Sequence, residues 1–231
     1  SAREMALAQQ LRRIDWIETA GEIGALLKEA ALVKQLQPSH NRQLRRNEEI
    51  CTWTLVDEGN GWLRPELAAA RNLDFGSGAS CYGLFKSARE AGETLRALAV
   101  EHNLCDALLG LEKTVPGKPC FGYQIKRCRG ACIGNEPFAR HTLRLVAALA
   151  RLKLVSWPFA GLALIREGDE AHLIHAWRYL GTVRSDEEIQ ALLDAGRPPF
   201  DRDTYKIVVK YVAKMIPLIF ARPANPGVTL R

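Results

Sequence analysis

The segment 118-KPCFGYQIKRCRGACIG-134 carries three cysteines, and a fourth cysteine lies upstream. Together they determine the kind of structure expected in this part of the chain. The four are Cys105, Cys120, Cys128 and Cys132, separated by fourteen, seven and three residues. Four thiolates from one segment can enclose a metal centre, and sulfur ligands select zinc or an iron–sulfur cluster. A zinc ribbon usually pairs its cysteines at CxxC-type spacings. Only the last two cysteines come near that spacing, so the gaps favour a cluster and leave zinc open.

Burial as small apolar side chains is the other role open to these cysteines, because free cysteine is often buried. Four cysteines in one short segment, beside Pro119, Gly130 and Gly134, speak against that role. The opening residues, SAREMALAQQ, lack an initiating Met and an apolar signal-peptide core. They are typical of the interior of a longer protein or of a trimmed one. A reducing cytoplasm is therefore expected, with metal ligation rather than disulfides.

The 231-residue chain has a formal net charge of +6, and its length suits one large domain or two small ones. The longest apolar region, 143–165, is interrupted by Arg144, Arg151, Lys153 and Pro158. A membrane span needs about 20 largely uncharged apolar residues, so no membrane partner is expected. The basic excess is compatible with nucleic acid as the partner and equally with a merely basic surface.

Basic residues gather in two places. Lys126, Arg127 and Arg129 alternate with the cysteines, where positive charge favours thiolates and suits a phosphate backbone. A second run, in an expected exposed connection, contains Arg42, Arg45 and Arg46. We predict that these six side chains contact DNA; a solvated basic loop is the alternative.

Capping signals and apolar periodicity predict an α+β protein. The spacing of Thr19 and Glu22 is that of a capping box and predicts a helix to about Leu36. Ser87 and Glu90 predict a second helix in the same way. Further helices are expected near 143–150, 185–196 and after 205; strands are expected at 51–56, within 62–85, near 154–157, 162–165 and 172–177, and before 220.

Glu29 is the carboxylate of interest on the first helix, where it lies near Leu26, Val33 and Leu36 on the helical wheel. We therefore expect it in or beside the apolar arc, where a carboxylate needs a cation, hydrogen-bond donors or a metal. Oxygen ligands suit Mg²⁺ or Mn²⁺. A glutamate at the edge of the arc, paired with an arginine, is the other interpretation. Asn41 either stabilises a loop or belongs to a ligand site.

Two blocks of the chain resemble the UvrC family of excinucleases. Residues 14–34, IDWIETAGEIGALLKEAALVK, with Gln37-Pro38 and Asn41, resemble the second half of a UvrC-type GIY-YIG nuclease domain. Residues 118–134 resemble the UvrC cysteine signature. The reading TAGEIGALLKEA at 19–30 and the long first cysteine gap are most similar to the shorter Cho branch of the family. The likeness covers most of the chain and is vague after about Leu154.

The resemblance implies a function and a set of roles. Glu29 would bind the single catalytic metal, Mg or Mn, with Asn41 near it. Cys105, Cys120, Cys128 and Cys132 would ligate a 4Fe–4S cluster. The partner would be damaged double-stranded DNA marked by UvrA and UvrB, incised on the 3′ side of the lesion.

The sequence departs from the family pattern at one decisive place. The first half of the GIY-YIG domain, which carries two tyrosines and a catalytic arginine, is missing, so the resemblance implies that this chain is inactive alone. The second nuclease half of full-length UvrC and its UvrB-binding segment have no room here, which favours the Cho branch. Two alternatives remain: the C-terminal module of a DNA polymerase III epsilon-like 3′–5′ exonuclease fusion, or a non-catalytic iron–sulfur or zinc DNA-binding module.

The expected organisation has four parts. Residues 1–47 form the second half of a GIY-YIG domain, and 48–103 a strand-rich connector plus a helix. Residues 104–150 form the cysteine-rich iron–sulfur segment and its helix, and 151–231 a small α+β C-terminal domain.

Overall fold

The computed structural model describes residues 5, 8–9, 12–36, 50–72, 80–115 and 117–218. Its elements, in chain order, are α2 (Glu22–Leu36), β1 (Cys51–Asp57), β2 (Leu63–Ala69), η1 (Ala70–Asn72), β3 (Tyr82–Phe85), α3 (Ala88–Glu101), α4 (Phe121–Gln124), η2 (Ala131–Ile133), α5 (Phe138–Leu149), η3 (Ala150–Leu152), β4 (Ala163–Glu167), β5 (Glu170–His175), β6 (Arg178–Val183), α6 (Asp186–Asp194), α7 (Arg202–Val208), η4 (Val209–Lys214) and β7 (Ile216–Pro217). The α+β prediction is confirmed. No described helix is both long and apolar enough to cross a membrane.

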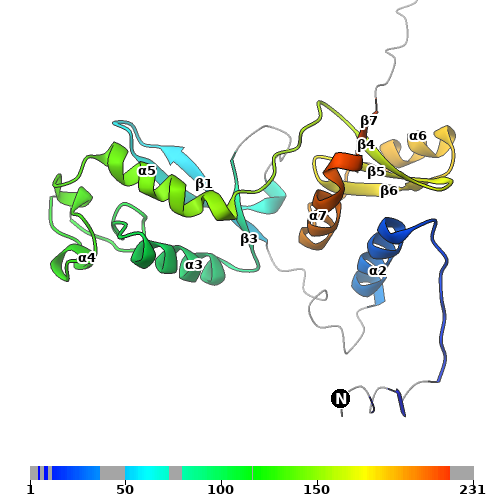
Figure 1. Ribbon diagram of the computed structural model, residues 1–231, viewed down its shortest axis with the longest axis horizontal. Helices are drawn as coiled ribbons and strands as arrows, with labels where there is room; N and C mark the ends of the chain where they lie inside the picture. Colours follow the sequence, from blue (N-terminus) through cyan, green and yellow to red (C-terminus); the bar gives the residue numbers. More distant parts are fainter. Residues whose placement is uncertain are drawn as a thin grey trace, which may run out of the picture.

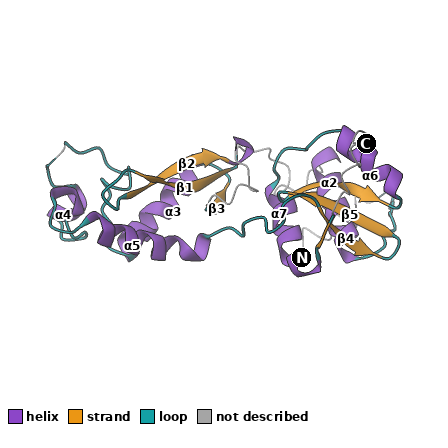
Figure 2. Ribbon diagram, turned by 90° about the horizontal axis from the view of Figure 1, so that it is seen from above, coloured by secondary structure: helices purple, strands orange, loops and turns teal. Residues whose placement is uncertain are grey.

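The first sheet is antiparallel, with strand order β2-β1-β3, and α3 and α5 lie along it (Figures 1 and 2). Trp53 on β1, Leu95 on α3 and Leu145 on α5 are buried in one apolar core. The Trp53 indole Nε1 also donates to the Ala91 carbonyl at 3.2 Å, which ties the sheet to the helix. This packing leaves the loops beyond α3 and before α5 at one end of the molecule, where α4 lies (Figure 1).

The second sheet has the order β6-β5-β4-β7 and is also antiparallel. Its core contains Ile165 and Trp177 together with Tyr205 of α7. Ile23 and Leu27 of α2 are buried in the same core, although they lie far from it in the sequence. In Figure 1, α2 and α7 stand beside this sheet, away from α4. We call residues 163–218, from β4 to β7 with α6 and α7, the C-terminal unit.

The cap of α2 differs from the prediction. The helix begins at Glu22, and the Thr19 hydroxyl donates to the Gly21 carbonyl at 3.0 Å instead of capping the first turn. The amides of Ile23 and Gly24 donate to the two carboxylate oxygens of Glu167 at 3.0 and 2.8 Å. The predicted capping box is wrong because a charged acceptor from a distant strand satisfies these donors more strongly than a local hydroxyl does.

The cap of α3 follows the prediction. The Ser87 hydroxyl accepts from the Glu90 amide at 3.2 Å. The Glu90 carboxylate accepts from the Lys86 amide at 2.7 Å, one residue away from the donor that a capping box uses. A local signal therefore sets this helix start.

The strand expected near 154–157 is wrong. The connection between the sheets has only an isolated bridge from Lys153 to Tyr82, and the Trp157 indole donates to the Gly161 carbonyl at 2.9 Å. Strands near 162–165 and 172–177 are confirmed as β4 and β5, and the late helices and last strand as α6, α7 and β7. The strand β6 was not predicted.

Candidate metal centre

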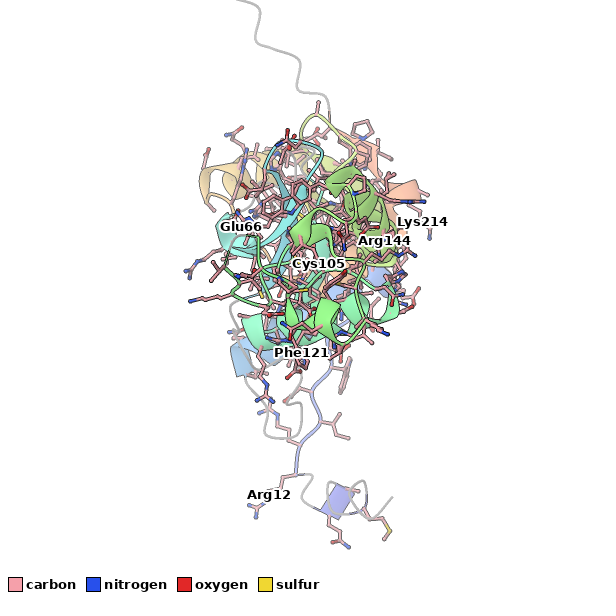
Figure 3. The ribbon with its side chains drawn as sticks, turned by 90° about the vertical axis from the view of Figure 1, so that its left-hand side faces the viewer. Arg12, Glu66, Cys105, Phe121, Arg144 and Lys214 are labelled. Atoms are coloured by element: carbon pink, nitrogen blue, oxygen red, sulfur yellow. The ribbon has the colours of Figure 1, made fainter. Side chains whose placement is uncertain are left out.

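Four cysteine sulfurs converge beside α4. The Sγ atoms of Cys105 and Cys120 lie 3.7 Å apart, and those of Cys120 and Cys128 lie 3.4 Å apart. The sulfurs of Cys105, Cys120 and Cys132 all lie within 4.8 Å of one another. Figure 3 faces this end of the molecule and labels Cys105 and the neighbouring Phe121. The predicted gathering of these four side chains, here called the cysteine cluster, is present.

Tight backbone turns bring the sulfurs together. Cys120 is the N-cap of α4, and Cys132 lies in η2 between two glycines in the left-handed region, Gly130 (φ 74°) and Gly134 (φ 81°). A Cβ on Gly130 would come within 2.7 Å of the Tyr123 ring. Glycine is therefore required at Gly130 both for its backbone conformation and for this close contact.

The cluster favours a thiolate at its centre. Burial raises the pKa of the Cys105 thiol and raises the pKa of Cys128 to about 11. Burial also opposes ionisation of Cys120, but its pKa is lowered because the Tyr123 amide and the neighbouring thiols donate to it. A bound cation would stabilise the other three sulfurs in the ionised form that metal ligands need.

Buried polar groups hold the backbone at Cys105, the first of the four cysteines. The Cys105 amide donates to Nε2 of His141 at 3.0 Å, and the imidazole is 0% exposed. Burial and the nearby Arg144 lower the pKa of His141 to about 4, so the neutral ring is an acceptor here. Arg144 in turn donates to the carbonyls of His102 and Asn103, both at 2.7 Å. Sequence analysis missed His141, because nothing in its spacing relates it to Cys105.

The residues predicted to contact DNA differ in their exposure. Lys126 and Arg129 are exposed around the cluster, whereas Arg127 is partly buried and forms an ion pair with Asp106. The Phe121 side chain on α4 is 56% exposed and lines the same cavity as Arg127 and Asp106. Residues Arg42, Arg45 and Arg46 lie outside the described residues.

The candidate nuclease residues lie elsewhere. Glu29 is exposed on α2, whose buried stripe is formed by Ile23, Leu27, Ala30 and Val33. Glu29 lies one helical turn before the buried Val33, so the carboxylate is beside the apolar arc and not inside it. Figure 1 shows α2 and α4 in different parts of the molecule, so the described residues form two separate candidate sites. Asn41 lies outside the described residues.

A second polar network was also missed. Glu167, which caps α2, lies 3.1 Å from Nε2 of His172, and Nδ1 of that ring lies 2.8 Å from the Thr182 hydroxyl. Burial opposes ionisation of Glu167, but the amides of Gly24 and Ile23 and the His172 ring lower its pKa. Spacing along the sequence does not reveal this pair, because the contact depends on the hairpin between β4 and β5.

The chain matches known families over most of its length. Residues 50–151 match the profile described as the UvrC/Cho excinuclease middle domain, and residues 163–222 match the excinuclease Cho C-terminal domain. Excinuclease Cho of Salmonella typhi and that of Escherichia coli strain K12 are each 43% identical to it over 213 residues. Those alignments cover 90% of this chain and 70% of each relative.

A longer relative matches in part. The UvrABC system protein C of Nitrobacter winogradskyi is 36% identical over 131 residues, covering 56% of this chain and 18% of that protein. No solved structure matches the chain. The identity and coverage of the first two relatives show that the chain belongs to the Cho excinuclease family.

Proposed function

We propose that this chain belongs to a nucleotide excision repair endonuclease that incises damaged DNA on the 3′ side of the lesion. The observation that carries the proposal is the 43% identity to proteins named excinuclease Cho over 90% of the chain. Residues 1–47 supply the second half of the nuclease domain, 48–103 and 104–150 the connector and the cysteine-rich segment, and 151–231 the C-terminal domain. The protein acts in the cytoplasm on damaged double-stranded DNA marked by UvrA and UvrB. The comparisons give no support to the exonuclease-fusion or non-catalytic alternatives.

Glu29 is the proposed ligand of the catalytic metal, Mg or Mn, with Asn41 beside it. Its carboxylate is exposed, and no described residue pairs with it, which is the state that a ligand for a hard cation requires. The bound ion would polarise the scissile phosphate and stabilise the leaving oxygen. The attacking water and the developing charge need further groups, so residues 1–231 alone are expected to be inactive.

The cysteine cluster is proposed to hold one inorganic centre. Four sulfurs are a donor set for a 4Fe–4S cluster, which the family resemblance favours, or for zinc. Sulfurs bound to one tetrahedral zinc at 2.3 Å lie roughly 3.8 Å apart. The separations of 3.4 and 3.7 Å fit that single ion, and a cluster would need the sulfurs to move apart. Iron, sulfide and zinc analysis of anaerobically purified protein decides between the two.

The DNA backbone is proposed to contact the exposed cations Lys126 and Arg129, together with Arg42, Arg45 and Arg46. Their positive charge suits phosphate. Arg127 contributes less than the sequence suggests, because Asp106 already neutralises it. The cysteine cluster would then fix the loop that presents these side chains.

An incision assay tests the proposed function. The whole protein, supplied with UvrA, UvrB and a duplex carrying one defined lesion, should produce a nick 3′ of the lesion only when Mg²⁺ or Mn²⁺ is present. The E29Q variant, which keeps the shape but loses the charge, should bind the complex normally and produce no nick. A nick on the 5′ side, or full activity of E29Q, would refute the assignment.

A further inference from the structure

The C-terminal unit grips α2 at both ends, and we propose that it is a clamp that positions the nuclease helix. In this reading Glu167 and His172 are positioning residues, acting through α2 on Glu29. The inference rests on the proposed function in one respect, that Glu29 is the metal ligand. The inference gives a role to the C-terminal unit, which carries no candidate nuclease residue.

The first contact is at the N-terminus of α2. The opening amides of a helix have no partner within it and carry partial positive charge. Both oxygens of the Glu167 carboxylate are used here, one on the Ile23 amide and one on the Gly24 amide, at 3.0 and 2.8 Å. A Cβ on Gly21 would lie 2.5 Å from Glu167 Oε1, so glycine at this position leaves room for the carboxylate. A two-point contact of this kind fixes both the rotation and the axial position of the helix.

The second contact holds Glu167 itself. His172 is fully buried, with one ring nitrogen 3.1 Å from Glu167 and the other 2.8 Å from the Thr182 hydroxyl. An ionised carboxylate only accepts hydrogen bonds, so Nε2 carries the proton in this pair. The Tyr179 hydroxyl is hydrogen-bonded to Thr182 in turn. The chain of contacts crosses β4, β5 and β6, and the sheet thereby fixes the carboxylate.

The third contact is near the other end of α2. Lys34 forms an ion pair with Asp201, the N-cap of α7, whose carboxylate also accepts from the Thr204 amide at 2.8 Å. Between the two ends, Ile23 and Leu27 are buried in the core of the C-terminal unit. Glu29 is exposed on the helix, clear of all three contacts. The clamp therefore holds the helix while the candidate metal ligand stays accessible.

Because α2 is a rigid helix, these contacts also determine the position of the Glu29 backbone. Glu29 follows Gly24 by five positions, a rise of about 7.5 Å along a rigid α-helix. A displacement of the first turn is therefore transmitted to the carboxylate. A misplacement of about 1 Å in a catalytic site can cost on the order of 100-fold in rate.

Hydrogen exchange and incision kinetics of the whole protein test the clamp, with E167Q as the main variant. In E167Q the amides of Ile23 and Gly24 should exchange about tenfold faster, because the charged cap is lost. The kcat of incision should fall by roughly 10- to 100-fold, with the KM for DNA within about twofold of the unchanged protein. D169N is the matched control: it removes a charge from the same hairpin, and Asp169 contacts the exposed Arg184 rather than α2. It should change neither readout.

The outcomes separate the clamp from the proposed function. Unchanged exchange in E167Q, or faster exchange with unchanged kcat, overturns the clamp. If E167Q does not fold, T182V provides the second variant, since it removes the hydroxyl that holds His172 while keeping the side-chain shape; it should give a smaller change in the same direction. Full activity of E29Q would instead refute the nuclease assignment, and the exchange data would still test the grip on α2.

Discussion

Replacing Arg144 by Met should destabilise the part of the fold that carries the cysteine cluster. The guanidinium forms an ion pair with Glu136 and donates to the two carbonyls that precede the cluster loop. The side chains of Arg144 and Glu136 are only 18% and 5% exposed. Removing one partner leaves a buried carboxylate without compensation, and this typically costs about 3–5 kcal/mol. Among the described residues Arg129 is also near Glu136, but it is 4.0 Å away and largely exposed, so it compensates the carboxylate only weakly.

Thermal unfolding followed by circular dichroism measures this loss. A reduction of that size should lower Tm by roughly 10 °C in a chain of this length. A second variant, R144M with Glu136→Leu, should recover most of the loss, because no charge is then buried alone. R89M is the control: the Arg89–Glu93 pair lies on the surface, where water screens it, and its Tm should not change measurably. Equal losses in R144M and R89M, or no recovery in the double variant, would refute the reasoning.

Three further predictions concern the metal, the DNA and the pH dependence. C120S should lose most of the bound metal, measured by elemental analysis, since this sulfur lies between two others. K126E with R129E should weaken binding to damaged duplex and reduce its salt dependence in a titration over NaCl concentration. Burial opposes ionisation of Asp201, but Lys34 and Thr204 lower its pKa below the usual 3.8. The folded pKa is thus below the unfolded one, so this stabilisation is complete above about pH 4 and is lost as pH falls through the folded pKa. The difference in urea midpoint between K34M and the unchanged protein should therefore be larger at pH 7 than at pH 3.

Local signals in the sequence predicted local structure well. Ser87 gave the start of α3 because its cap lies within the same turn. The convergence of the cysteines was predictable because short gaps and glycine turns confine the sulfurs to one region. The strand Cys51–Asp57 followed from its β-branched and aromatic residues.

Features that depend on distant contacts were not predictable. The cap of α2 comes from Glu167, more than a hundred residues away, so Thr19 could not reveal it. Whether Glu29 lies in the apolar arc or beside it stayed open, because the sequence does not say how far the core covers the edge of α2. His141 and His172 acquire their partners only when helices and strands pack, and spacing alone shows neither.

The sharing of one core by α2 and the C-terminal unit affects the order in which the protein matures. Ribosomes deliver the chain from its amino end, so α2 emerges long before Glu167 and Trp177 exist to receive it. Until then the helix has neither its cap nor its apolar partners, and a helix of 15 residues is marginal by itself in water. A nascent or prematurely terminated product would therefore lack an ordered α2. Any incision of DNA that depends on Glu29 then requires a polypeptide translated past β5.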